Sequence, residues 1–183
     1  MAFTVRSNSF KDGDYLAPEH ILSADYGFGC TGGNKSPHLA WTGVPAGTKS
    51  FAITCFDPDA PTGSGFWHWT VVNIPASVTE LKLDAGNLKA GLLPKGAISA
   101  RTDLGQTGYI GPAPPPGHGP HRYAFQVFAL DSAASLPPTP GREALLDVLP
   151  MHALASGCLI GTYERHDTTV SAAEEAAQGA AVV

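Results

Sequence analysis

The chain has 183 residues, of which 43% are hydrophobic and only 15% are charged. This length and composition predict one compact domain with a single sizeable core. The formal net charge is −5, and the eleven Lys and Arg residues are scattered, so no basic stripe is present to neutralise phosphates and a nucleic-acid partner is not expected. No apolar run approaches the ~18 residues that a membrane span needs, so no membrane span is expected.

The N-terminus and the cysteines favour a cytoplasmic protein. Residues 1–14 lack the basic start, apolar run and cleavage site of a secretory signal. The three cysteines, Cys30, Cys55 and Cys158, are widely spaced, and no CxxC or His/Cys ligand pattern joins them. Free thiols in a reducing cytoplasm are the favoured interpretation, and a disulfide from Cys30 to one of the others is the alternative.

Short strands separated by turns indicate a predominantly β fold. The strand-like segments are residues 3–10, a short stretch at Trp41, 49–56, 69–74, 121–130 and 158–165. The segments 49–56 and 69–74 are almost continuously apolar, which predicts central strands with both faces covered. Segment 121–130 alternates along its length and is the strongest strand prediction.

Residues 142–157 carry the one persuasive helical pattern, and Pro150 interrupts it. Proline is well suited to the first position of a helix, so a second short helix is expected to begin at Pro150. The Ala- and Glu-rich segment 167–183 has no large anchoring residue before its final valines, and we expect it to be mobile or weakly helical. No linker divides residues 1–166, which are expected to form one domain.

The motif DPDAPTGSGFWHW joins two predicted strands. Asp57 ends the first strand and His68 lies in the next, so a hydrogen bond between them is expected if the strands are neighbours. Such a bond would orient the imidazole and favour its protonated form, with Trp67 and Trp69 packed on either side. The alternative is that Asp57 and Asp59 cap a turn and that His68 is a structural histidine.

The motif GPAPPPGHGPHRY precedes the strand 121–130. Its five prolines donate no N–H, so it cannot cradle phosphate as a P-loop does. The prolines make the loop stiff, and the N–H groups of Gly111 and Ala113 are expected to lie close to a ligand. His121 and Tyr123 are two residues apart and therefore share one face of the strand. The alternatives are a polyproline ligand for an SH3-type partner and a loop that is merely rigid.

The two motifs together predict one small pocket with N–H donors, potential positive charge and a carboxylate behind it. Such a pocket suits a small anion such as phosphate or a phosphoryl head group. Its expected lining residues are Asp57, His68, His121 and Tyr123, with backbone N–H groups of the Gly111 loop. Its expected apolar rim is Phe66, Trp67 and Tyr109.

The segments DPDAP, WHW, NIP and GPAPPPGHGPHRYAFQVFAL resemble, in this order, the phosphatidylethanolamine-binding protein family. The resemblance is to its bacterial branch, often described as Raf-kinase-inhibitor-like, and it runs from GGNKSPHLAW to GTYER, over most of the chain. It implies a two-sheet Greek-key β fold with short helices near the C-terminus. It also implies a pocket for phosphate-like groups.

Residue by residue, the resemblance assigns the pocket aspartate to Asp57 and the next acid to Asp59. The remaining positions that match the family's pocket are His68, Gly111, His121 and Tyr123. Ala113 departs from the Gly or Cys that many relatives have at this position.

The resemblance and the predicted pocket indicate a non-catalytic binding module for a small anionic or phosphorylated ligand. Family members are described as inhibitors of kinases or proteases, and the bacterial branch makes a homodimer plausible. No cofactor and no metal are expected. One alternative is a metal-dependent enzyme that uses two histidines and an aspartate. Another is a hydrolase, although no G-x-S-x-G motif is present and nothing marks Ser64 as activated.

Overall fold

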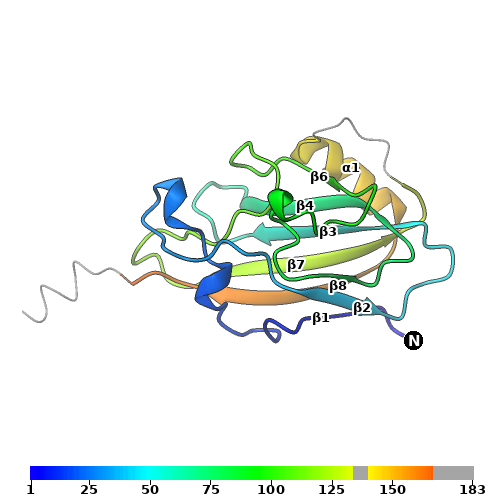
Figure 1. Cartoon of the computed structure of the whole chain (residues 1–183), viewed down its shortest axis with the longest axis horizontal. Coiled ribbons are helices and arrows are strands. Elements are labelled where there is room, and N and C mark those ends of the chain that lie inside the picture. The colour runs from blue at the N-terminus through cyan, green and yellow to red at the C-terminus, as the bar shows by residue number, and fades with distance from the viewer. Residues whose placement is uncertain (134–139, 167–183) are drawn as a thin grey trace, which may run out of the picture.

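The computed structural model describes residues 1–133 and 140–166, so the expected mobile segment 167–183 lies outside the described residues. Two antiparallel sheets form the described part, in the strand orders β6-β4-β3-β7-β8 and β1-β2-β5 (Figure 1). The strands are β1 (Thr4–Arg6), β2 (Leu39–Thr42), β3 (Ser50–Asp57), β4 (Phe66–Pro75), β5 (Glu80–Leu81), β6 (Ile98–Ser99), β7 (His121–Leu130) and β8 (Ala153–Tyr163). The predicted predominantly β, two-sheet fold is confirmed.

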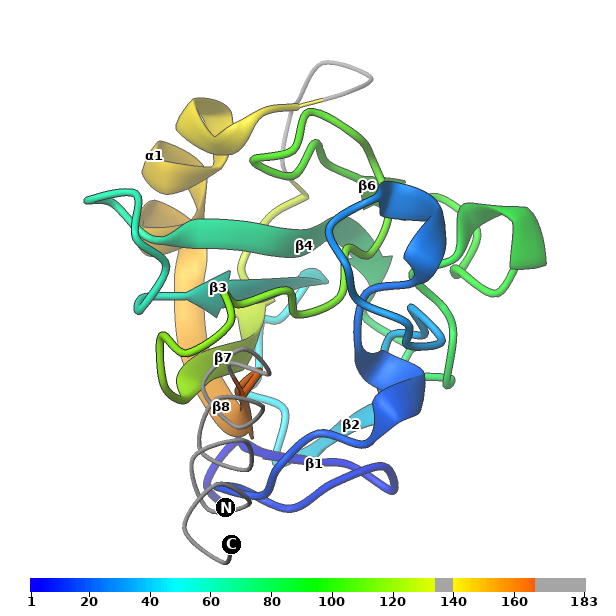
Figure 2. The same cartoon turned by 90° about the vertical axis from the view of Figure 1, so that its left-hand side faces the viewer.

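Both faces of the central strand β3 are covered, as its continuous apolar sequence predicts. On one face the larger sheet packs against the smaller sheet, through side chains that include Val5, Leu39, Trp41, Phe51, Ile53, Trp69 and Phe125. On the other face Ala52 and Val72 pack against Leu145 and Leu149 of the helix α1 (Arg142–His152). Figure 2 shows α1 and the smaller sheet on opposite sides of the larger one.

A β-bulge in β4 decides which side chains face the space between the sheets. Cys55 of β3 pairs with Trp69, but the next residue, Phe56, pairs with Trp67, so β4 has one extra residue at His68. A bulge re-aims the side chains of its strand. As a result, His68 and Trp69 both lie on the side of the smaller sheet, although they are neighbours in sequence.

The C-terminal prediction of two short helices is wrong. A single helix, α1, contains Pro150 near its end, where the missing N–H removes only one backbone hydrogen bond. Strand β8 begins at Ala153, not at residue 158, and Ala153 pairs with Leu130 of β7. The long alternating strand β7 offers a complete row of backbone partners, and this pairing overrides the weak helical preference of residues 153–157.

Two further predictions concern the cysteines and the membrane. Cys30 and Cys55 are buried, Cys158 is exposed, and all three are free thiols, so the alternative of a disulfide from Cys30 is not found. Within residues 1–133 and 140–166, no helix is both long enough and apolar enough to cross a membrane.

Candidate ligand-binding site

The polar residues of both motifs meet at one end of the larger sheet, the end that faces the viewer in Figure 2. Asp57 is the last residue of β3 and pairs with Phe66, the first residue of β4. His121 is the first residue of β7, the other neighbour of β3. Because antiparallel neighbours begin where the central strand ends, the three strands deliver these side chains to the same place.

Asp57 is bound to His121, not to His68. The His121 Nδ1–H donates to Asp57 Oδ2 at 2.7 Å, and both side chains are almost fully buried. The second carboxylate oxygen, Oδ1, accepts the backbone N–H of Asp59 at 2.8 Å. The predicted Asp57–His68 bond is therefore wrong, because β7 rather than β4 places its histidine against the carboxylate. A carboxylate on Nδ1 fixes the tautomer of a neutral His121, with its lone pair on Nε2.

His118, which the sequence reasoning missed, completes a chain of three polar side chains. Its Nδ1 lies 2.5 Å from Nε2 of His121, and the two rings meet edge to face with centroids 4.8 Å apart. One proton can lie between the two nitrogens, so a neutral His121 accepts it from His118. His118 is exposed and stands between Gly117 and Gly119, both of which have positive φ. The sequence feature that could have indicated His118 is its position in a Gly-rich turn, three residues before His121 at the start of β7.

His68 also lies at this site, but a backbone carbonyl and not Asp57 holds its ring. Its Nδ1–H donates to the backbone carbonyl of Ile110 at 2.8 Å. Its ring lies between Phe66 and Tyr123, with centroid distances of 4.8 and 5.2 Å. Burial lowers the pKa of His68 below its usual value, against the opposing effects of the Ile110 carbonyl and Asp57. His68 is therefore neutral at neutral pH, not protonated as expected.

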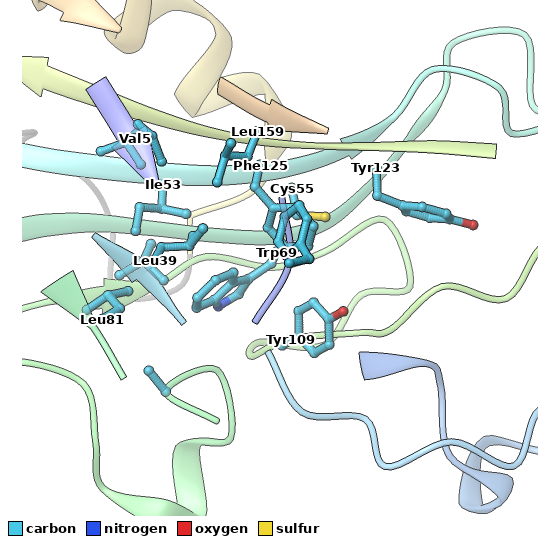
Figure 3. Packing of buried hydrophobic residues seen from close by; sticks show 14 of the residues in the cluster. Val5, Leu39, Ile53, Cys55, Trp69, Leu81, Tyr109, Tyr123, Phe125 and Leu159 are labelled. Carbon is cyan, nitrogen blue, oxygen red and sulfur yellow. The ribbon is translucent and has the colours of Figure 1, made fainter. Parts of the chain in front are cut away.

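Tyr123 shares a face of β7 with His121, as predicted, and its ring lies 6.5 Å from the imidazole at an angle of 24°. Figure 3 shows its hydroxyl pointing away from the packed side chains of Cys55 and Phe125. The hydroxyl is buried and has no hydrogen-bond partner within the described residues. Burial, and next the charge of Asp57, raise the pKa of Tyr123, so it keeps its proton. A buried hydroxyl without a partner is unfavourable unless a ligand or water accepts from it.

These side chains line one cavity of about 240 Å³. Its polar wall is formed by Asp57, His68, His121 and Tyr123. Most of the remaining wall is apolar: Leu22, Phe28, Ala60, Pro61, Phe66, Leu104, Ile110, Ala113, Pro114 and Pro115, with Thr62 and Gly111. The cavity is therefore a small, mostly apolar space with its polar groups gathered on one side, which is the usual composition of a ligand site.

Gly111 forms part of the wall, but its N–H is not available to a ligand. The N–H donates to Oδ1 of Asn34 at 2.8 Å, so this part of the prediction is wrong. A Cβ atom at position 111 would lie 2.6 Å from His20 O and from Leu22 N, so only glycine lets the two segments approach. Ala113 lines the cavity, as predicted.

Asp59, one of the expected ligand-binding residues, does not line the cavity. Its carboxylate accepts from Nε and Nη2 of Arg122 at 3.0 and 2.9 Å, and from the Arg122 backbone N–H at 2.8 Å. These bonds to Arg122 lower the pKa of Asp59 to about 2. Since the Asp59 N–H in turn holds Asp57, this ion pair positions the aspartate of the cavity.

Two of the three predicted rim residues lie elsewhere. Phe66 lines the cavity, but Trp67 faces the opposite side of the sheet, where its ring lies 5.7 Å from the guanidinium of Arg142. Tyr109 packs edge to face against Trp69 and donates its hydroxyl to the carbonyl of His20 at 2.8 Å. The tryptophans therefore do not enclose the imidazole of His68; Phe66 and Tyr123 do.

A further contact that the sequence did not indicate holds the mouth of the cavity. Arg165 donates from Nε to the carbonyl of Pro114 at 2.6 Å and from Nη1 to the carbonyl of Phe28 at 2.9 Å. Both acceptors belong to residues that line the cavity. Arg165 thus joins two loops that are far apart in sequence.

The geometry does not favour the two enzymatic alternatives. Within the described residues, no group of three or more His, Cys, Asp or Glu side chains is placed to hold a metal ion. Ser64 is absent from the cavity wall, and its carbonyl accepts a hydrogen bond from Arg142. A hydrolase needs its nucleophile within hydrogen-bond reach of a base, and Ser64 does not meet this condition.

Comparisons with known proteins identify the family of the chain. The family model described as phosphatidylethanolamine-binding protein matches residues 6–164. The UPF0098 protein YbcL of Escherichia coli (strain K12) is 50% identical over 160 residues, which cover 87% of this chain and 78% of that protein. The UPF0098 protein YbhB of the same organism is 55% identical over 127 residues, which cover 68% and 76%.

A solved structure supports the same assignment. The crystal structure of E. coli YbcL, described as a new member of the mammalian PEBP family, superimposes with a TM-score of 0.84 at 47% sequence identity. The match covers 90% of this chain and 99% of that chain. The chain therefore belongs to the phosphatidylethanolamine-binding protein family, in its bacterial branch.

Proposed function

We propose that the protein is a non-catalytic binding module whose cavity holds a small anionic group, such as a phosphate or a phospholipid head group. The observation that carries this proposal is the Tyr123 hydroxyl, a buried donor without a partner among the described residues, on the wall of a cavity. A ligand oxygen placed there satisfies it. The description of the family, phosphatidylethanolamine-binding protein, supports the same chemistry.

The chain of Asp57, His121 and His118 supplies the second polar contact. The carboxylate of Asp57 accepts the Nδ1–H of His121 and orients the imidazole on the cavity wall. Because His118 does not line the cavity, an anion takes the place of His118 at Nε2 of His121 and accepts from this ring as well as from Tyr123. Charge-assisted hydrogen bonds of this kind are the strong ones in proteins.

The size of the cavity indicates a head group and not a whole lipid. Its volume of about 240 Å³ lies below the roughly 300–1,000 Å³ of sites for drug-sized ligands. The half-exposed ring of Phe28 stands at the open side, so the rest of a larger ligand would extend past it into solvent.

Calorimetric titration with phosphoethanolamine at pH 6 tests the proposal, with Tyr123→Phe as the principal variant. The substitution removes one oxygen atom and keeps the ring. Because a hydrogen bond to a charged group contributes about 1.5–3 kcal/mol, the affinity should fall about 10- to 150-fold. His121→Ala should weaken binding by a similar factor.

Tyr15→Phe is the matched control. The Tyr15 hydroxyl is exposed and bonds to Glu164 at 3.0 Å, outside the cavity. Its removal should leave the affinity unchanged. If Tyr123→Phe and His121→Ala bind as tightly as the unmodified protein, the assignment of the site is wrong.

Inhibition of a kinase or protease is part of the proposal through the family resemblance. A partner protein would meet the chain at the open side of the cavity, near Phe28. Phosphoethanolamine should then compete with such a partner for the protein, and simultaneous binding of both would contradict this part.

A further inference from the structure

His68 gives the cavity a hydrogen-bond acceptor, which a site for a fully ionised anion does not need. The bond from Nδ1–H to the Ile110 carbonyl leaves the lone pair on Nε2 of the neutral ring. The ring lines the cavity, and no described residue donates to Nε2. Burial lowers the pKa of His68, which keeps this lone pair available.

The permanent charge on the cavity wall is negative. Among the described residues, Asp57 is the one acidic side chain in the wall, and no Lys or Arg side chain lines it. The nearby guanidinium of Arg122 is already paired with the carboxylate of Asp59 outside the cavity. The guanidinium of Arg165 at the mouth is not part of the wall and already donates to the carbonyls of Pro114 and Phe28. A dianion would therefore meet a carboxylate and an imidazole lone pair without a fixed cation in the described wall to offset them.

We propose that the cavity selects an oxyanion that still carries a proton, such as the monoanion of a phosphate monoester. The P–OH group donates to Nε2 of His68, while the ionised oxygens accept from Tyr123 and, in place of His118, from Nε2 of His121. Every polar group on the wall then has a complementary partner. This inference rests on the proposed function and specifies the protonation state of the ligand.

Methyl phosphate and methyl sulfate form a ligand pair that isolates the proton. Both are tetrahedral, and at pH 5.5 both carry about one negative charge, because the second pKa of a phosphate monoester is about 6. Only methyl phosphate has an O–H to donate. Calorimetry should show methyl phosphate binding at least about tenfold more tightly, the lower end of the effect of a hydrogen bond to a charged group.

His68→Phe identifies the acceptor. The phenyl ring keeps the packing between Phe66 and Tyr123 but has no lone pair, so the ratio of the two affinities should fall close to one. His20→Phe is the matched control, since His20 is also fully buried and its Nδ1 also lies 2.8 Å from a carbonyl oxygen, that of Lys35. His20 does not line the cavity, so the ratio should persist there.

The outcomes separate this inference from the proposed function. Equal affinities of the unmodified protein for both esters would overturn the inference and leave the anion site standing. A preference that survives in His68→Phe would also overturn it, because the weaker acceptor strength of a sulfate ester would then explain the difference. Binding of neither ester would overturn the proposed function and this inference with it. If His68→Phe does not fold, equal affinities of the unmodified protein for the two esters would still overturn the inference.

Discussion

Two histidine–carboxylate pairs in this fold have similar geometry and different surroundings. The distance from His121 Nδ1 to Asp57 Oδ2 is 2.7 Å, and that from His38 Nε2 to Glu80 Oε2 is 2.9 Å. The first pair lies at the end of the larger sheet, on the wall of the cavity. The second joins the smaller sheet to the N-terminal segment, and the Glu80 side chain is 55% exposed.

The second nitrogen of each imidazole shows what separates a structural pair from a site. His38 Nδ1 accepts the backbone N–H of Asn8 at 3.0 Å, so the protein itself uses both ring nitrogens. Within the part of the chain that the structure describes, His121 Nε2 contacts only His118, an exposed side chain between two glycines. The carboxylate pair alone therefore does not distinguish the two histidines; the position of His121 on the cavity wall and its exposed partner His118 do.

Removal of the Asp57 carboxylate should lower the free energy of unfolding much more than removal of the Glu80 carboxylate. Asp57→Ala leaves the Nδ1–H of His121 and the N–H of Asp59 buried without an acceptor, and the free energy of unfolding should fall by about 3 kcal/mol. Glu80→Ala breaks an exposed pair, which solvent screens, and should lower the free energy of unfolding far less. Urea unfolding of both variants measures the difference. Equal losses would show that burial does not distinguish the two pairs.

The pH dependence of stability should reveal the buried, neutral His68. Its pKa is lower in the folded than in the unfolded state, so below pH ~6.5 the unfolded chain takes up a proton that the native state does not. Stability should therefore fall as the pH decreases from about 7.5 to 5. In His68→Phe this decrease should be smaller. Urea unfolding at several pH values measures this dependence. If the free energy of unfolding changes with pH in the same way for both proteins, His68 is not the buried, neutral histidine responsible.

His118→Ala should have the smallest effect on stability. The imidazole is exposed, and water can replace it at Nε2 of His121, so the free energy of unfolding should change by less than about 0.5 kcal/mol. The same urea titration measures it. A loss above about 1 kcal/mol would show that His118 is a structural partner, as Asn8 is for His38.

The strands could be predicted where the pattern of apolar residues in the sequence matches the burial of the strand in the folded sheet. Strand β7 matches the prediction at both ends, and the apolar runs of β3 and β4 are central, as expected. Residues 153–157 could not be assigned from pattern alone. Their alanines and glycine carry no strand signal, and only the pairing with β7, more than twenty residues away in sequence, makes them a strand.

The composition of the site was predictable, but its hydrogen bonds were not. Asp57, His68, His121 and Tyr123 do line one cavity. Which histidine the aspartate binds depends on the order of the strands, since β3 lies between β4 and β7. The direction of His68 depends on the bulge in β4, which arises from the register with β3 and has no signature in the motif itself.

The contacts of Arg165 have a consequence for the order of events during synthesis. Phe28 and Arg165 are separated by 137 positions, yet one guanidinium joins the loop of Phe28 to that of Pro114. On the ribosome, the first loop emerges long before the arginine that fastens it. The mouth of the cavity therefore takes its final shape only after Arg165, near the end of the described residues, has been released.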